Sequence, residues 1–130
     1  MAFSDDIRRF TTKTTEAHNK IARVATLELF SGVIKATPVK HGRARGGWTT
    51  SVGAPAASPE RLDPSGSSAV SEVVEKTPEG AGQVTYLSND LPYIMALEEG
   101  SSTQAPEGMV RKNMDRVQRM VETAIRKNKV

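Results

Sequence analysis

The sequence predicts an α+β fold in one domain spanning residues 1–130, with a long N-terminal helix, a small antiparallel sheet and a C-terminal amphipathic helix. Apolar residues recur at steps of three and four near both ends of the chain, which is the spacing of a helix face. Between these ends, two short segments alternate in polarity as half-buried strands do. A chain of 130 residues is an ordinary length for a single domain.

The composition predicts a thin core. Aromatic residues make up 5% of the chain and apolar residues 37%, against the roughly 45–50% that is usual when glycine is also counted. We therefore expect either a small core with loose extensions or a subunit that completes its packing against copies of itself. The net charge of +3 is small for a dedicated nucleic-acid binder.

The sequence also excludes several classes of protein. It contains no cysteine, which rules out disulfides, thiol catalysis and thiolate metal sites and fits a protein made in a reducing cytosol. The first residues lack the apolar run of a signal peptide, and no stretch approaches the ~20 apolar residues that a membrane-crossing helix needs. We expect no membrane association and no cofactor.

Residues 4–36 are predicted to form one long helix. Its apolar stripe is sparse in the first half and becomes dense from Leu27 to Ile34. We interpret the dense second half as the part that packs on the core, and the sparse first half as a projection toward another subunit. Pro38 disfavours helical geometry at Thr37, so the helix should end there.

The middle of the chain is predicted to hold two strands, at residues 48–53 and 83–88, separated by a long loop. The loop, residues 54–68, contains three prolines and almost nothing to bury. We expect it to be flexible until a partner binds, because loops of this length are usually functional or disordered. Residues 69–76 allow either a short helix or an edge strand, and we favour the helix.

The C-terminal helix is predicted to begin at Pro106, a residue type that suits the first position of a helix, and to run to about residue 127. Basic residues lie off its apolar stripe, as in an ordinary surface helix, so they do not by themselves indicate nucleic-acid binding. The stripe comprises Val110, Met114, Val117, Val121, Ala124 and Ile125.

The segment 37–48, TPVKHGRARGGW, is the most distinctive part of the sequence. It sets Arg43 and Arg45 two positions apart in front of the only tryptophan, Trp48. On an extended backbone the two arginines would point the same way and could contact carboxylates or phosphates together. The alternative is a solvated turn whose Trp48 fills the core. Nucleotide binding is not favoured, because phosphate-binding loops open helices and this one is predicted to open a strand.

A second segment places Tyr93 close to two neighbouring acids, Glu98 and Glu99. Paired carboxylates can serve as general acid and base, but sequence neighbours point in different directions and no catalytic companion is evident. We interpret these acids as ion-pair partners of the two arginines, within the subunit or across an interface.

No residue set in the sequence indicates a catalytic, cofactor-binding or metal-binding site, and we expect a protein that is not an enzyme. His18 and His41 lie far apart in the sequence and lack acidic neighbours at ligand spacing. The candidate interface residues are Arg43, Arg45, Trp48, Tyr93, Glu98 and Glu99.

Several short motifs, in order and in register across nearly the whole chain, resemble the minor tail protein Z family of tailed bacteriophages, the tail-completion or head–tail joining proteins. In the first half the matching residues are Thr37, Pro38, Val39, Gly42, Arg43, Ala44, Arg45 and Trp48. In the second half they are Asn89, Pro92, Tyr93, Leu97, Glu98, Gly100, Ser102, Gln104, Ala105, Pro106, Gly108, Met109 and Val110. Lys40 and His41 depart from the residue pairs common in that family.

The resemblance implies a non-enzymatic virion protein, assembled in the host cytoplasm and located at the neck or upper tail, where it is needed for head–tail joining. It implies a multi-copy ring with a tail terminator and head-completion or connector proteins as partners, and leaves proximity to the genomic DNA open. We expect the Arg43/Arg45 turn to meet a carboxylate surface, with Glu98 and Glu99 as leading candidates, so that Arg45→Glu blocks joining in a folded subunit. The alternative is a small basic DNA-binding module that uses the C-terminal helix and the Gly-Arg turn.

Overall fold

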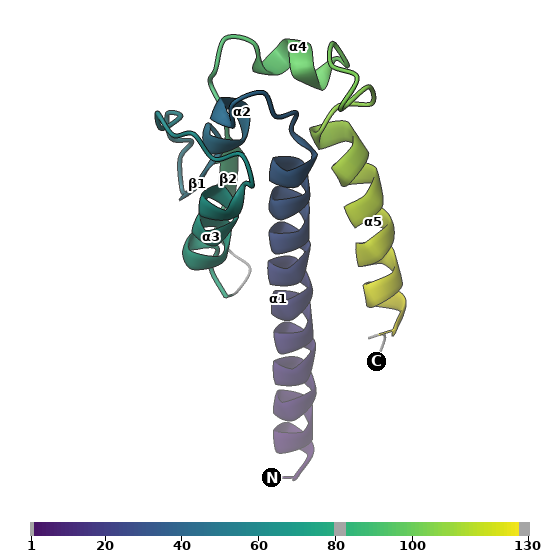
Figure 1. Cartoon of the computed structure of the whole chain (residues 1–130). Coiled ribbons are helices and arrows are strands. Elements are labelled where there is room, and N and C mark those ends of the chain that lie inside the picture. Colours follow the sequence, from purple (N-terminus) through teal and green to yellow (C-terminus); the bar gives the residue numbers. More distant parts are fainter. Residues whose placement is uncertain (1, 80–82, 128–130) are drawn as a thin grey trace.

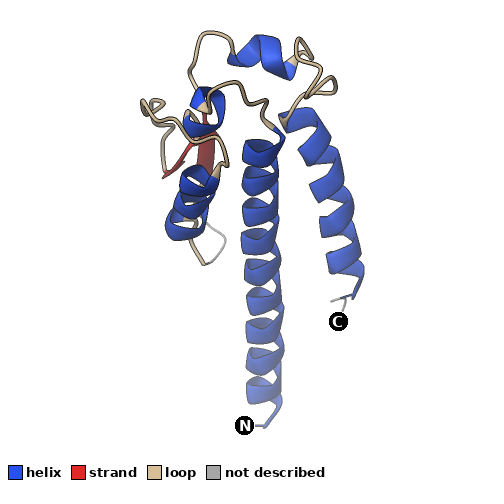
Figure 2. Ribbon diagram, viewed as in Figure 1, coloured by secondary structure: helices blue, strands red, loops and turns tan. Residues whose placement is uncertain are grey.

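The computed structural model describes residues 2–79 and 83–127, with side chains from residue 18 onward, and confirms the α+β fold (Figure 1). A long helix stands between a second long helix on one side and a small helix-and-sheet unit on the other (Figure 2). The elements in chain order are α1 (Ala2–Ala36), α2 (Arg43–Gly46), β1 (Thr49–Val52), α3 (Ser67–Lys76), β2 (Thr85–Ser88), α4 (Ile94–Glu98) and α5 (Val110–Lys127).

Helix α1 carries the centre of the core on its second half, as its apolar stripe predicted. Val33 and Ile34 are 2% and 0% exposed and pack with Trp48, Val73 and Met109, which come from three other parts of the chain. The first half of α1 runs on well past the ends of α3 and α5 (Figure 1). The projection of that half is therefore confirmed, while its contact with another subunit stays a prediction.

The sheet is a single antiparallel pair, with Thr50 opposite Leu87. Two four-residue strands are marginal alone, and α3 packs on β1. One Glu72 carboxylate oxygen on α3 accepts hydrogen bonds from the Thr49 hydroxyl and the Thr50 backbone N–H, each 2.8 Å long. Burial would raise the pKa of the Glu72 carboxyl, but these hydrogen bonds and the nearby cations outweigh it and hold the pKa below its ordinary value.

The segment 54–68 differs in part from its prediction. Its last two residues belong to α3, whose helical form is confirmed. The prediction that it has almost nothing to bury is wrong for Asp63, which is 5% exposed. The Asp63 carboxylate accepts a 2.9 Å hydrogen bond from the Ala69 N–H, in the first turn of α3, and thereby satisfies a backbone donor that the helix cannot.

The start and the packed face of α5 also differ from prediction. The helix begins at Val110 rather than Pro106, because Gly108 has a φ of +81°, which does not continue a right-handed helix. On the predicted stripe Val117 is buried, but Met114 is 54% exposed and its neighbour Asn113 is buried instead. The packed face is thus turned toward Asn113, whose side chain lies against α1.

Gly32 sets the close approach of α1 to α5. A Cβ atom at this position would lie 2.2 Å from the Asn113 Oδ1 and 2.7 Å from the Arg116 Nη2. The Asn113 side chain is held, because it is buried and donates a 2.8 Å hydrogen bond to the Met109 carbonyl.

We predict that Gly32→Ala destabilises the protein by about 1–3 kcal/mol in denaturant unfolding, because the added methyl group forces the two helices apart. In an exposed helix the same substitution would stabilise by up to about 1 kcal/mol through helix propensity. An increase in stability would therefore contradict the close contact.

Candidate functional site

The two segments that carry the sequence motifs meet at one end of the molecule, where α1 ends and α4 crosses (Figure 1). The Val39 N–H donates to the Gln104 side-chain oxygen at 2.9 Å, and the Gln104 amide donates back to the Val39 carbonyl at 3.2 Å. The Asn89 amide donates to the Ala44 carbonyl at 2.9 Å. Side-chain amides thus fasten the corner after α1, residues 37–48, to the segments on both sides of α4.

The predicted extended backbone at Arg43 and Arg45 is wrong, although the segment leads into a strand, β1, as predicted. Residues 43–46 form the single helical turn α2, because Gly42 adopts a φ of +85° and its carbonyl accepts the Gly46 N–H at 2.9 Å. Residues two apart on a helix do not face each other. Arg43 and Arg45 therefore point in different directions and have different partners.

Arg45 braces the subunit from within. Its guanidinium donates to the carbonyls of Lys35 at 2.8 Å, Thr37 at 2.8 Å and Pro64 at 2.7 Å. Two of these carbonyls lie at or just beyond the end of α1, where backbone acceptors lack helical partners and a positive charge is favourable. Replacing Arg45 is therefore expected to disturb the subunit itself, which makes Arg45→Glu a poor test of an interface.

Trp48 lies where the alternative interpretation placed it, in the core. It is 6% exposed, and its indole N–H donates a 2.8 Å hydrogen bond to the Thr37 hydroxyl, which donates in turn to the Val33 carbonyl at 2.7 Å. A side chain this deeply buried offers a partner almost no surface while the subunit is folded.

Sequence reasoning missed Arg61, which lies in the long loop. Its guanidinium donates to the Gly46 carbonyl at 3.0 Å and the Trp48 carbonyl at 2.8 Å, and it pairs with Glu72 at 3.5 Å. The loop is therefore tied to α2, to the residue just before β1, and to α3. Nothing in the local sequence distinguishes this arginine from a solvated one.

Glu98 is not an ion-pair partner of Arg43 or Arg45 within the subunit. Its carboxylate caps α5 by accepting the N–H groups of Met109 and Val110, each at 2.8 Å, and it pairs with Arg111 at 3.2 Å. Burial would raise the pKa of the Glu98 carboxyl, but the backbone hydrogen bonds and the Arg111 guanidinium outweigh it and lower the pKa.

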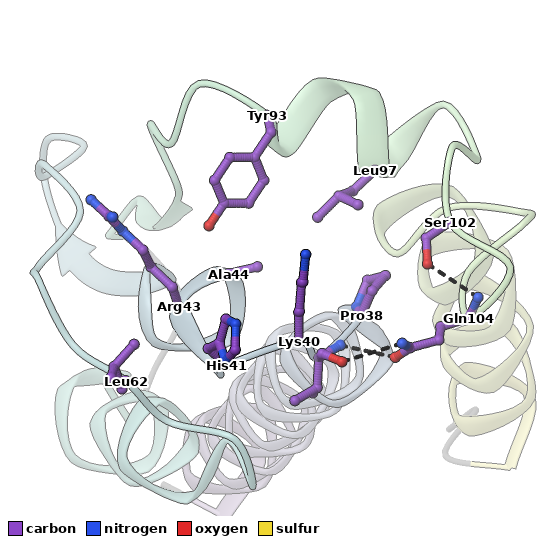
Figure 3. Close-up of a pocket in the computed structure, with 11 residues that line it drawn as sticks. Pro38, Lys40, His41, Arg43, Ala44, Leu62, Tyr93, Leu97, Ser102 and Gln104 are labelled. Atoms are coloured by element: carbon purple, nitrogen blue, oxygen red, sulfur yellow. Dashed lines mark hydrogen bonds between the residues drawn. The ribbon is translucent and has the colours of Figure 1, made fainter.

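An open pocket of about 710 Å³ lies between the two motif segments (Figure 3). The Tyr93 hydroxyl and the Lys40 side chain reach into the hollow from opposite sides, and Arg43 stands at its rim. Glu99, which is also exposed, does not line it. The lining residues are Pro38, Val39, Lys40, His41, Arg43, Ala44, Leu62, Tyr93, Leu97, Ser102 and Gln104.

The basic side chains of this pocket have no acidic partner in the described part of the chain. Lys40, His41 and Arg43 are exposed, and in the described part of the chain none of their side chains has a hydrogen bond or an ion pair. None of the lining residues is acidic. The pocket therefore combines an apolar interior with a positively charged rim, which suits an apolar ligand that carries negative charge.

Within residues 2–79 and 83–127 no group of three histidine, aspartate or glutamate side chains could hold a metal ion. None of the helices described there is both long and apolar enough to cross a membrane. Comparison of the chain with family models, curated proteins and solved structures finds no match.

The two arginines of the turn are expected to respond differently to the same substitution. Arg45→Ala leaves three carbonyls without a charged donor and should cost about 2–3 kcal/mol of unfolding free energy. Arg43→Ala removes an exposed side chain without a partner in the described residues. It should change the unfolding free energy by less than about 0.5 kcal/mol. Equal effects in denaturant unfolding would contradict this division of roles.

The Glu98 cap predicts a pH-dependent loss of stability. Because folding lowers the Glu98 pKa below 4.5, its contribution is fully present above about pH 4.5 and is lost as the pH falls through the lower folded pKa. Glu98→Gln should therefore cost about 1 kcal/mol near pH 7 and progressively less in acid. Unfolding measured across pH, with exposed Glu107→Gln as control, tests this, and a cost that persists in acid would contradict it.

Proposed function

We propose that this chain is a structural component of a tailed-bacteriophage virion, a tail-completion or neck protein that acts as part of a multi-copy ring and is needed for head–tail joining. The observation that carries the proposal is that the residues behind the resemblance, spread from Thr37 to Val110, gather at one end of the molecule around one open pocket. A motif set that surrounds an open pocket supports a role in binding another component of an assembly.

Part of the motif set holds the fold together and part lines the pocket. Arg45, Trp48, Asn89 and Glu98 hold backbone groups or fill the core. The motif residues that line the pocket are Pro38, Val39, Arg43, Ala44, Tyr93, Leu97, Ser102 and Gln104. A rigid corner that presents an open pocket supports docking of another protein there.

The shape of α1 supports assembly in several copies. Its first half extends beyond the rest of the subunit, while the pocket lies at the opposite end (Figure 1). Subunits of a closed ring offer two different surfaces to their two neighbours, and such a projection supplies one of them. On this proposal the chain is assembled in the host cytoplasm, and its partners are a tail terminator and head-completion or connector proteins.

The second candidate is a DNA-binding module that uses α5. Exposed Lys112, Arg119 and Arg126 favour it, but two other basic residues of the helix are already paired, Arg111 with Glu98 and Arg116 with Glu28. It requires duplex affinity that falls steeply with salt. A salt-titrated gel shift on the purified chain distinguishes this candidate from the structural one.

We predict that Arg43→Glu blocks head–tail joining in a phage that encodes this chain, while the purified variant stays folded. The reversed charge would repel an acidic docking surface. The Arg43 side chain makes no hydrogen bond or ion pair in the described part of the subunit, so its replacement should leave the fold intact. The measurement is the yield of joined particles against free heads and tails in electron micrographs, with unfolding of the purified variant alongside.

Arg119→Glu, an equal charge reversal on the exposed face of α5, is the matched control and should leave joining intact. Normal joining by Arg43→Glu phage would overturn the proposed role of this end of the molecule. Loss of joining by the α5 variant alone would favour the DNA-binding candidate instead.

A further inference from the structure

The open pocket has a chemistry that defines its ligand more closely than a general docking role does. Its lining includes the side chains of Leu62, Tyr93 and Leu97, while the Lys40 amine reaches into the hollow and Arg43 stands at the rim with its guanidinium turned outward (Figure 3). Leu62 is 68% exposed and Tyr93 is 41% exposed, so both apolar surfaces face water in the free subunit. Covering them with apolar groups is favourable.

The charges limit what can cover these surfaces. Lys40 and Arg43 have no ion pair in the described part of the subunit. The exposed acid Glu60 does not line the pocket, but it lines a smaller neighbouring hollow together with Arg43 and Leu62. The Tyr93 hydroxyl likewise has no hydrogen-bond partner among the described residues, and it points into the hollow. Two donors without acceptors therefore point into an apolar space, and a third stands at its rim.

A peptide meets both requirements better than duplex DNA does. A phosphate backbone would satisfy the cations but would leave the leucine and tyrosine surfaces uncovered, since it presents charge rather than apolar side chains. A segment with a large apolar side chain between carboxylates would fill the interior and pair with the rim. The volume of about 710 Å³ lies within the usual range of sites that enclose a ligand of this size.

We propose that the pocket binds a segment of another virion protein in which a large apolar side chain is flanked by aspartate or glutamate. The apolar side chain packs between Leu62, Tyr93 and Leu97, and the carboxylates pair with Lys40 and Arg43. The proposal rests on the proposed function only for the source of the segment, and the chemistry of the pocket can be tested without any phage particle.

The test is a selection of short random peptides displayed against the purified chain, repeated against the double variant Lys40→Glu/Arg43→Glu. The original chain should enrich peptides with a large apolar residue flanked by acids. The double variant should bind these peptides on the order of tenfold more weakly and should enrich peptides flanked by lysine or arginine. The control Arg119→Glu/Arg126→Glu reverses two exposed charges on α5 and should bind like the original.

A second variant tests the apolar part separately. Leu62→Ser changes a side chain that is mostly exposed, so the subunit should remain folded and yet bind the selected peptides more weakly. Equal binding by Leu62→Ser would overturn the apolar anchor. Peptides without acids, or equal enrichment on the charge-reversed variant, would overturn the rim pairing.

Other occupants give different results. Duplex DNA that displaces the selected peptides would assign the pocket to nucleic acid and overturn the proposal. Self-association of the pure chain that Lys40→Glu/Arg43→Glu abolishes would assign the pocket to a second copy, with the same consequence. Acidic peptides selected by a chain whose Arg43→Glu phage joins normally would uphold the pocket chemistry and contradict only the proposed function.

Discussion

The guanidinium group of Arg45 is the contact on which the rest of this end of the molecule depends. It binds carbonyl oxygens of Lys35, Thr37 and Pro64, and so joins the end of α1, the chain just after it and the loop that leads into α3. Arginine suits this position because its planar fork of five donors stays charged and can serve several acceptors at once. One wall of the pocket, from Pro38 to Ala44, follows directly on the Thr37 carbonyl that Arg45 holds.

Charged side chains also bind backbone groups at other places in the described structure. Asp63 caps α3, Glu98 caps α5, Glu72 binds the edge of β1, and Arg61 binds the carbonyls around Trp48. Each is a charged side chain from one element that bonds to the backbone of another. Hydrogen bonds to charged groups are stronger than neutral ones, and in a chain with 5% aromatic residues they hold segments that apolar contact alone would hold loosely.

The sequence predicted the elements better than it predicted the contacts between them. The second half of α1 and the strand pair follow from spacing and alternation, which are local properties. The helical turn α2 does not, because it depends on a positive φ at Gly42 that a glycine permits but does not require. Residue type alone likewise could not show that Asn113, rather than Met114, faces α1.

The predicted site residues fall into two groups, those at the pocket and those that bond within the subunit. Tyr93 and Arg43 lie at the pocket, as a role in binding requires, but Arg45, Trp48 and Glu98 are used inside the subunit. Their hydrogen-bond partners are distant in the sequence: Arg111 is 13 positions from Glu98, and Pro64 is 19 positions from Arg45. No local pattern distinguishes a charged residue that waits for a partner protein from one that already holds a distant carbonyl.

This division has a consequence for binding. Because Arg45 and the Val39–Gln104 pair fix the walls before any partner arrives, a ligand need not order the pocket and loses less free energy on association. Arg43 and Lys40 can then act on the partner alone, since neither supports the fold in the described residues. A motif set that looks like one interface is therefore two sets of residues, one that builds the corner and one that the corner presents.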